Sequence, residues 1–407
     1  MARLLHAAVP AEDPQDNPAT WPAWGQLLPH VLTATDPRRH LSGAEEDVAW
    51  LLHRAATYLQ TRGDLVPARP LFERARDLRR SLLGEDHPDT LASASSLSFS
   101  WWALGQYEHA HQGAEPSFIR CRRILGEDHP DTLWSAFILA LTLFYLGQYE
   151  PARQLGEDTL TRMRRVLSDD HPHTLRVAYC HAFVLRALGR YDQARQRGED
   201  ALTRCRRVLG EDHPDTLRAA HTLVATLRAL GLHERAHQLG EDNLIRCRRV
   251  LGEDHPDTLR AAHTLVATLR ALGLHEQARQ LAEDTLTHRC RVLGENHPDT
   301  LRSADSLAAT LRELKQYESA RQLGENAFTR IRGVLGEDHP DTLRAASNFA
   351  AILLALGLHE RAHQLAKDTL TRMRRVLGDD HPVTLRSTHL ACCPGDVTTT
   401  SSRQLKA

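Results

Sequence analysis

The chain of 407 residues carries 51 lysines and arginines against 52 aspartates and glutamates. The formal net charge of −1 gives no global attraction to nucleic acid or to an anionic membrane. No apolar run reaches the roughly 20 residues that span a bilayer, and the N-terminus turns acidic before a signal-peptide core develops, so we expect a cytoplasmic protein.

The first segment of the chain, residues 1–44, predicts one helix, from about Trp21 to Leu32, between proline-rich flanks. We interpret this segment as a helical lead-in to the region that follows.

Internal repeats organise the rest of the chain. The string "LGEDHPDTL" begins at Leu83, and related strings begin every 42 residues as far as Leu377. Residues 208–234 and 250–276 are identical over 27 positions. Such regular spacing without insertions predicts a stack of equal structural units.

One unit can be read as a helix–turn–helix. Pro214 suits the first position of a helix, and Asp215 complements the positive end of the helix dipole. Apolar residues then recur at three- and four-residue steps as far as the turn at Gly231. A second helix runs from about His233 to Leu251 and ends at Gly252.

A helical hairpin of this kind buries its apolar face only by stacking on its neighbours, so we expect an all-α, right-handed α-solenoid. The turn positions are Gly63, Gly105, Gly147, Gly189, Gly231, Gly273, Lys315 and Gly357, which predicts eight repeats over residues 45–385. Lysine in this column is expected to cost stability if the turn requires a positive φ. Residues 386–407 form a degenerate repeat stump, which Pro394-Gly395 should break, and a Thr/Ser-rich tail with Cys392 and Cys393.

The motifs "LGQYEHA" (104–110), "LGQYEPA" (146–152) and "LGRYDQA" (188–194) resemble tetratricopeptide (TPR) repeats. The 42-residue period with "LGxDHPxTL" resembles the kinesin-light-chain subtype, and residues 17–32 resemble the lead-in to TPR arrays of bacterial NB-ARC (STAND) regulators. This resemblance implies a scaffold that holds a partner's peptide or helix in a concave groove. The chain departs from the kinesin-light-chain pattern where paired asparagines are usual, for example at His221-Thr222 and His263-Thr264.

His-Glu-x-x-His occurs at 233–237 and 359–363, a spacing that binds zinc in metalloproteases. His233, however, stands in a column of tyrosines and His237 in a column of arginines, so repeat structure explains both. The sequence therefore predicts no catalytic residue, no cofactor and no metal, with a zinc hydrolase as the less favoured alternative.

Arginine-rich strings such as 246–249 suggest a nucleic-acid binder as another alternative. Asp242 and Asp200 stand four residues before Arg246 and Arg204, which favours a charge-balanced helix face instead. Cys121, Cys205 and Cys247 share a column with methionine and isoleucine, so we expect them to be inert core thiols.

By register with the family, the groove is lined by four positions of each first helix. These positions hold aromatic residues in the early repeats and mostly arginines in the later ones. Because Asp305 is the one acid at the same positions of the later repeats, we expect a groove that is aromatic at its N-terminal end and basic further along. Such side chains often anchor interfaces. The predicted residues are Phe99, Trp102, Trp134, Phe137, Phe144, Tyr179, Phe183, Arg176, Arg186, Arg218, His221, Arg228, Arg260, His263, Arg270, Arg302, Arg312 and Arg344.

The sequence thus favours a non-catalytic scaffold for a protein partner with an apolar or aromatic anchor and an acidic stretch. A second hypothesis is the sensor array of a split STAND system that acts with a separate NTPase. Self-association through the C-terminal end stays open as well.

Overall fold

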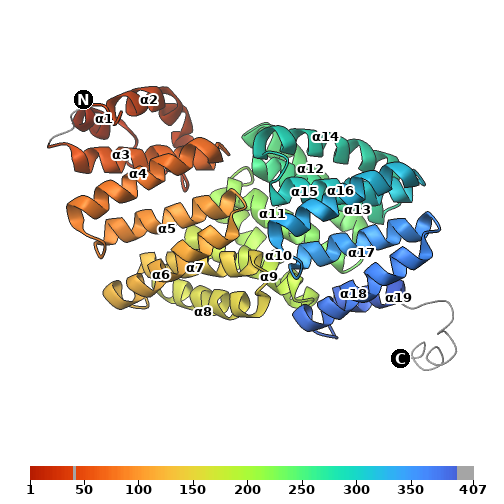
Figure 1. The fold of residues 1–407 in the computed structure, drawn as a ribbon. Coiled ribbons are helices and arrows are strands. Elements are labelled where there is room, and N and C mark those ends of the chain that lie inside the picture. Colours follow the sequence, from red (N-terminus) through yellow and green to blue (C-terminus); the bar gives the residue numbers. More distant parts are fainter. Residues whose placement is uncertain (40–42, 392–407) are drawn as a thin grey trace. The chain divides into compact units, whose positions relative to one another are not determined.

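The computed structural model describes residues 1–39 and 43–391, and every regular element in this part of the chain is a helix (Figure 1). Three helices precede the repeats: α1 (Ala2–Ala8), the 3-10 helix η1 (Pro18–Thr20) and α2 (Trp21–Ala34). The helix expected near Trp21 is present as α2, whereas the sequence pattern did not predict α1. Among the described helices, none combines the length and the apolar character needed to cross a membrane.

Helix pairs with the predicted period follow, and the all-α solenoid expected from the sequence is confirmed. The first helices of the pairs are α3 (Glu45–Thr61), α5 (Pro88–Ala103), α7 (Pro130–Tyr145), α9 (Pro172–Ala187), α11 (Pro214–Ala229), α13 (Pro256–Ala271), α15 (Pro298–Glu313) and α17 (Pro340–Ala355). The second helices are α4 (Leu65–Leu83), α6 (Tyr107–Leu125), α8 (Tyr149–Leu167), α10 (Tyr191–Leu209), α12 (His233–Leu251), α14 (His275–Leu293), α16 (Tyr317–Leu335) and α18 (His359–Leu377). A last helix, α19 (Pro382–Ala391), begins a ninth unit. The predicted break at Pro394-Gly395, together with Cys392 and Cys393, lies outside the described residues.

The histidine before each helix-starting proline caps the first helix. Nδ1 of His213 accepts a hydrogen bond from the backbone N–H of Asp215 at 3.1 Å, and Pro214 has no N–H to satisfy. The same bond, at 3.1 to 3.2 Å, is made by His87, His129, His171, His255, His297, His339 and His381. Capping therefore explains this histidine column, and it requires an unprotonated Nδ1.

The turns after the helices require positive φ angles. Glycine supplies them at most positions, for example at Gly210 (φ 91°) after α10 and Gly231 (φ 77°) after α11. In the described residues, two positions lack glycine: Lys315 has φ 62° and Ser168 has φ 91°. The positive φ considered for Lys315 is confirmed, and Ser168 is a second strained position.

Small and branched side chains in fixed columns hold the stack together. The alanines in one column of the second helices have no exposed surface, so neighbouring helices approach closely: Ala68, Ala110, Ala152, Ala194, Ala236, Ala278, Ala320 and Ala362. Leucines near the start of the first helices, such as Leu217 and Leu259, are 2% and 3% exposed. Truncating one such leucine to alanine typically costs about 2–5 kcal/mol.

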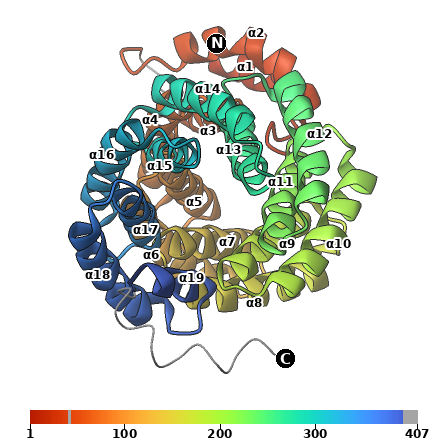
Figure 2. The same cartoon turned by 90° about the vertical axis from the view of Figure 1, so that its right-hand side faces the viewer.

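The chain forms two compact units, residues 1–230 with 242–258 and residues 231–241 with 259 onward. Within each unit the first helices form one layer and the second helices form the other (Figure 2). In the first unit α7 and α9 lie beside each other and are covered by α8 and α10; in the second unit α15 and α17 are covered by α16 and α18. The face of a unit that its first helices make is called here the first-helix surface.

The N-terminal helices belong to the core of the first unit. Trp24 and Val31 of α2 have no exposed surface and pack in one hydrophobic cluster with Leu51 and Leu52 of α3 and Phe72 of α4. Because their apolar faces are buried against the first repeat, α1 and α2 are an integral part of this unit.

Candidate interaction surface

Aromatic side chains predicted for the groove come together on the first-helix surface of the first unit. Phe99 and Trp102 of α5 stack with ring centroids 4.9 Å apart, and Trp102 meets Tyr145 of α7 edge-on at 5.4 Å. Phe144, next to Tyr145, contacts Phe183 of α9 at 4.6 Å. The Phe, Trp and Tyr members of this connected set that the first helices contribute are called here the aromatic cluster: Phe99, Trp102, Trp134, Phe137, Phe144, Tyr145 and Phe183.

The aromatic cluster is partly accessible to a partner. Phe137 and Phe144 are buried, but Phe99, Trp102, Trp134, Tyr145 and Phe183 each keep part of their surface exposed. Sequence reasoning missed Tyr145, because this position lies next to the four columns that the family register assigns to the groove. A half-exposed aromatic surface shared by the first helices of three successive repeats can bury an apolar side chain of another protein.

Arg186 places a positive charge beside this cluster. Its guanidinium lies over the ring of Phe183, 4.8 Å from the centroid. Burial lowers the pKa of Arg186, and among the described residues no carboxylate forms an ion pair with it. A half-buried guanidinium with no counter-charge in the described part of the chain is suited to bind an acidic group of a partner.

Tyr179, Arg176 and Arg218 are all hydrogen-bonded to one buried aspartate, and their role in binding a partner stays a prediction. Asp215 has no exposed side-chain surface and accepts hydrogen bonds from Arg176 Nη2 at 2.6 Å, Tyr179 Oη at 2.8 Å and Arg218 Nη1 at 3.0 Å. Arg218 Nε also donates to Asp257 at 2.7 Å. Burial would raise the pKa of Asp215, but the charges of Arg176 and Arg218 lower it far below its usual range.

A similar arrangement occupies the second unit. Arg302 contacts Asp299 at 2.5 Å and Asp341 at 3.5 Å, and Arg344 contacts Asp341 at 3.3 Å and Asp305 at 2.7 Å. We call these arginines and aspartates, together with those around Asp215, the Arg–Asp ladder.

The ladder corrects the expectation of an uncompensated basic surface. The acids that neutralise its arginines are mostly the aspartates of the His-Pro-Asp triplets, three residues before each arginine. These aspartates lie outside the four groove positions from which the basic surface was predicted. Arg270 and Arg312 are likewise paired with Glu313, at 2.7 Å and 3.6 Å. The remaining predicted positions His221, Arg228 and Arg260 lie half-buried on α11 and α13.

His263 belongs to a buried polar network that the sequence did not reveal. Its Nδ1 lies 3.5 Å from Oγ of Ser303, which accepts a hydrogen bond from Nη1 of Arg289 at 2.8 Å. Burial lowers the pKa of His263 well below its ordinary value, so the imidazole is neutral. The same network recurs five repeats earlier with His53, Ser93 and Arg79.

Arg79 and Arg289 stand in the column of Cys121 and Met163, which was expected to be apolar. Arg289 is 2% exposed, and its Nη1 donates to the carbonyl of Asp299 at 2.6 Å as well as to Ser303. A serine fourteen residues later supplies an acceptor in both repeats. Ser135 stands at the same distance after Cys121, so the serine alone does not mark a buried arginine.

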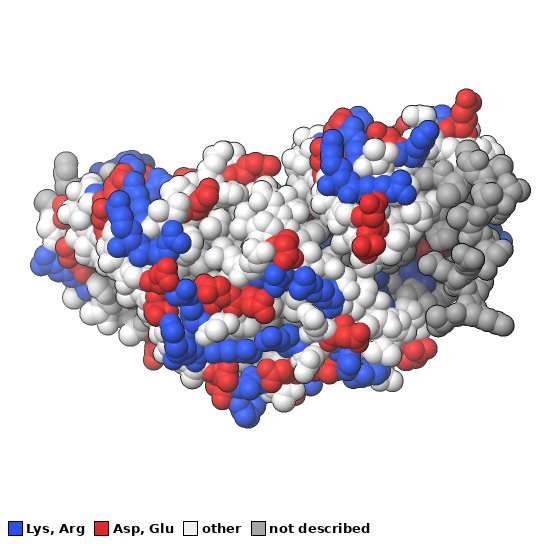
Figure 3. Space-filling model, turned by 90° about the horizontal axis from the view of Figure 1, so that it is seen from below, with Lys and Arg blue, Asp and Glu red and all other residues white. Residues whose placement is uncertain are grey.

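The arginine triplets of the second helices are engaged with acids. The predicted pairs Arg246–Asp242 (2.9 Å) and Arg204–Asp200 (3.0 Å) are confirmed. Arg246 and Arg249 also reach Asp212 in the loop of the preceding repeat, at 3.2 Å and 2.6 Å. Figure 3 shows such positive and negative side chains next to one another over one face of the molecule, which is unlike the continuous basic stripe of a nucleic-acid site.

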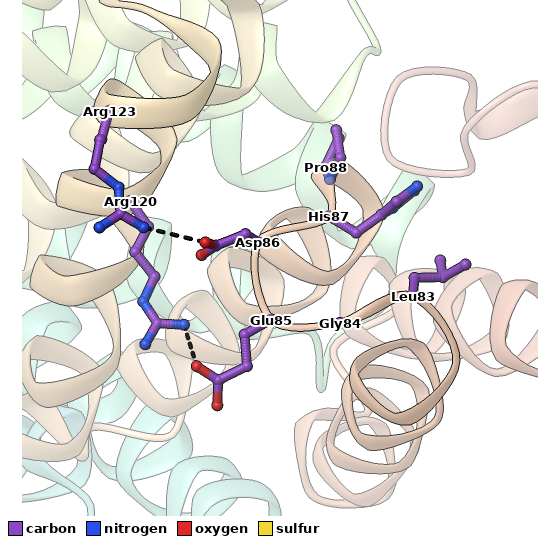
Figure 4. Close-up of a pocket in the computed structure, with 8 residues that line it drawn as sticks. All are labelled: Leu83, Gly84, Glu85, Asp86, His87, Pro88, Arg120 and Arg123. Atoms are coloured by element: carbon purple, nitrogen blue, oxygen red, sulfur yellow. Dashed lines mark hydrogen bonds and ion pairs between the residues drawn. The ribbon is translucent and has the colours of Figure 1, made fainter.

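A cavity of about 550 Å³ opens at the first of these loops (Figure 4). Arg120 and Arg123 of α6 point across it to Glu85 and Asp86, at 2.5 Å and 3.2 Å. The loop before α5 therefore makes the same contact between repeats as the later loops, and its polar groups are already paired with each other.

The His-Glu-x-x-His stretches follow the repeat register. Nε2 of His237 lies 3.4 Å from Glu241, one turn further along α12. Among residues 1–39 and 43–391, no cluster of three or more His, Cys, Asp or Glu side chains could hold a metal ion. Cys121, Cys205 and Cys247 are buried, and burial raises the pKa of Cys205 and Cys247 to about 12, as befits inert thiols.

Comparison with known proteins supports the repeat assignment. The family model of the tetratricopeptide repeat matches residues 47–115, 102–165, 173–244, 267–328 and 300–375. No curated protein matches the chain.

Solved structures resemble the fold at low identity. A Rap protein complexed with Competence and Sporulation Factor is 10% identical, with 84% of this chain and 97% of the other covered and a TM-score of 0.58. Aspartyl phosphate phosphatase F from Bacillus subtilis is 15% identical, with 80% and 86% covered and a TM-score of 0.50. A Podosopora anserina putative kinesin light chain with nearly identical TPR-like repeats is 21% identical, with 61% and 96% covered and a TM-score of 0.30.

Proposed function

Because the chain belongs to the tetratricopeptide repeat family, we propose that it is a non-catalytic scaffold that binds another protein on its first-helix surface. The observation that carries this proposal is the aromatic cluster with Arg186 at its edge. The partner would place an apolar or aromatic side chain against Trp102, Tyr145 and Phe183, and an acidic group on Arg186. Interfaces concentrate their binding energy in aromatic and arginine anchors of this kind.

The Arg–Asp ladder narrows the binding site. Arg218, Arg302 and Arg344 are engaged by aspartates, so they give less attraction to an acidic partner than their number suggests. We therefore place the principal contact in the first unit, on α5, α7 and α9. The Rap protein of similar fold was solved in complex with Competence and Sporulation Factor, which fits a partner-binding role for this architecture.

A reducing compartment such as the cytoplasm fits the free thiols of Cys121, Cys205 and Cys247. The second hypothesis, a sensor array that acts with a separate NTPase, stays a prediction, and no similarity described above concerns it.

Affinity capture from a lysate of the native cell, with mass spectrometry, tests the proposal. The baits are the wild type, Trp102→Leu, Arg186→Gln and a control, Arg195→Ala, which removes a half-exposed arginine of the second helix α10 paired with Glu199. A partner that the wild type and Arg195→Ala retain, and that both other variants lose, supports the proposal. Circular dichroism must show that all four are folded, and equal recovery by all baits would contradict the assignment of the site.

A further inference from the structure

The fourth repeat lacks an acid that most other repeats have. The second residue after the capping histidine is Asp89, Asp131, Asp215, Asp257, Asp299 and Asp341 in six repeats, but His173 in the fourth. In the Arg–Asp ladder this aspartate contacts the arginine three residues later, as Asp215 contacts Arg218 at 3.0 Å. Arg176 has no such acid on its own helix, which leaves a place for a carboxylate beside it.

Asp16 from the N-terminal segment occupies that place. Its Oδ1 accepts from Arg176 Nη2 at 3.3 Å, and its Oδ2 lies 3.4 Å from Nε2 of His173. Its backbone carbonyl lies 3.4 Å from Nε2 of His213, the cap of α11. Three side chains from two successive repeats thus converge on one residue 160 positions away from Arg176 in sequence.

The electrostatics of the contact match a carboxylate site. Burial would raise the pKa of Asp16, but the hydrogen bond with His173 and the charge of Arg176 lower it to about 2. Arg176 is 3% exposed, and its Nη1 is buried without a hydrogen-bond partner. Its Cζ lies 5.4 Å from the ring centroid of Trp134 in the aromatic cluster. Asp16 therefore leaves one donor of the guanidinium unused, and a better-placed acid could satisfy it.

The segment around Asp16 is attached to the unit by few contacts. Between α1 and η1, Asp13 pairs with Arg54, and the carbonyl of Pro14 accepts from Trp21 Nε1 at 2.8 Å. Glu12 and Ala11 are exposed. The segment is acidic and forms a turn at Pro14–Asp16, in which the backbone N–H of Asp16 donates to the carbonyl of Asp13 at 3.1 Å. An acidic peptide of a partner could present a carboxylate from a similar turn.

We propose that His173 and Arg176 form a carboxylate-binding site, with His213 holding the backbone carbonyl of the same residue. Asp16 fills this site in the free chain, and an aspartate or glutamate of a partner replaces Asp16 there. The proposal rests on the proposed function, because the site borders the aromatic cluster through Trp134. The N-terminal segment is then an internal ligand, which an external acidic ligand must displace.

Amide hydrogen exchange on the full chain tests the internal contact. The variants are Asp16→Asn, which removes the carboxylate, and His173→Asp, which restores the aspartate of the other repeats. Both should speed exchange at residues 11–17, whereas exchange in α9 and α11 stays as in the wild type. Asp192→Asn, the loss of an exposed acid of α10, is the control and should change nothing in this segment. Unchanged exchange at 11–17 in Asp16→Asn would overturn the proposal.

Binding of a defined peptide tests whether the site takes an external acid. The probe is a fluorescein-labelled peptide of residues 9–19, VPAEDPQDNPA, measured by fluorescence anisotropy. We expect binding to Asp16→Asn to be at least about tenfold tighter than to the wild type, because the tethered copy competes at an effective concentration in the millimolar range. The double variant Asp16→Asn/His173→Asp should lose this gain, since the carboxylate introduced by His173→Asp would occupy the site.

A second peptide with asparagine in place of Asp16 tests whether binding requires the carboxylate. Equal binding of the two peptides to Asp16→Asn, or no binding of either, would overturn the carboxylate site. Peptide binding as expected, with no partner lost from the Trp102→Leu and Arg186→Gln baits, would leave this site standing and refute the proposed function alone.

Discussion

Arg176 and Asp215 form a buried ion pair that joins the first helices of two successive repeats. Their Nη2 and Oδ2 atoms are 2.6 Å apart, and their side chains are 4% and 0% exposed. Burying two charges costs several kcal/mol per ion, which the pair offsets only when additional hydrogen bonds complete it. Tyr179 and Arg218 supply those bonds to Asp215, and Asp16 supplies one to Arg176.

Replacing Asp215 with asparagine should therefore destabilise the protein strongly. The change leaves Arg176 buried with only the weaker Asp16 contact, and the expected loss is about 3–5 kcal/mol in the free energy of unfolding. Urea unfolding measures it. Asp212→Asn removes an exposed loop acid that pairs with Arg249 and should cost at most about 1 kcal/mol. Equal effects of the two changes would show that burial does not set the energetics of the ladder.

Glycine in place of Ser168 should stabilise the protein. Ser168 has φ 91° and ψ 162°, a backbone region that is nearly restricted to glycine. Relief of the strain should exceed the entropy that glycine adds to the unfolded chain, for a net gain of about 1 kcal/mol. The reverse change, Gly210→Ser, at the same place in the next repeat and with the same φ of 91°, should cost a similar amount. A Ser168→Gly variant no more stable than the wild type would show that the strain is relieved elsewhere.

Leucine in place of His181 should raise stability and weaken its pH dependence. His181 is 3% exposed, both of its ring nitrogens lack hydrogen bonds, and burial lowers its pKa from 6.5 to about 4. Leucine occupies the same column at Leu139 and Leu223, so it fits the space. The gain expected near neutral pH is about 1–3 kcal/mol, because no buried polar atoms remain unsatisfied.

The pH dependence follows from the direction of that shift. The unfolded chain binds a proton at His181 below about pH 6.5 and the folded chain does not, so the wild type loses stability as the pH falls from 6.5 towards 4. Between about pH 7 and pH 5 this residue alone should cost about 2 kcal/mol. Urea unfolding at both pH values should show that cost in the wild type and its absence in His181→Leu. Parallel losses in the two proteins would assign the proton uptake to other histidines, such as His53.

Thiol labelling should separate the cysteines by burial. Cys205 and Cys247 are almost fully buried, with pKa values raised to about 12, whereas Cys290 is half-buried. Since only the thiolate reacts, iodoacetamide should modify Cys290 well before the other two in the folded protein. Peptide mapping by mass spectrometry measures each site, and labelling in urea is the control in which all three should react at similar rates. Early modification of Cys205 would indicate that its repeat opens.

The fold could be predicted from the sequence because nearly every repeat has the same residue types at the starts and ends of its helices. Pro214 and Gly231 bound a first helix, His233 and Gly252 bound a second, and the 42-residue spacing repeats both. The sequence was less informative about charge. The acids that neutralise Arg218 lie on its own helix, at Asp215, and on the following repeat, at Asp257, and only the three-dimensional register brings the three together.

The contact between Asp16 and Arg176 lay beyond any repeat comparison. The N-terminal segment has no counterpart in the array, so periodicity says nothing about where it packs. The sequence gives one indication of this contact, the replacement of the usual aspartate by His173. That replacement can be interpreted only when the segment that contacts His173 is known. The burial of Arg289 could not be predicted for a similar reason. Cys121 and Met163, which occupy the same position in other repeats, indicate an apolar site there and say nothing about an arginine.

Near-identical repeats can pair incorrectly during folding, because residues 208–234 can pack in the place of the identical residues 250–276. The polar groups that differ between repeats disfavour such incorrect pairing. Asp305 is 2% exposed and is satisfied by Arg344 and by Asn348, the latter at 2.9 Å. A chain shifted by one repeat would bury that carboxylate away from Asn348. Asp305 thus favours the one pairing of repeats in which Asn348 faces it. The few residues that differ between repeats therefore specify which repeat packs beside which.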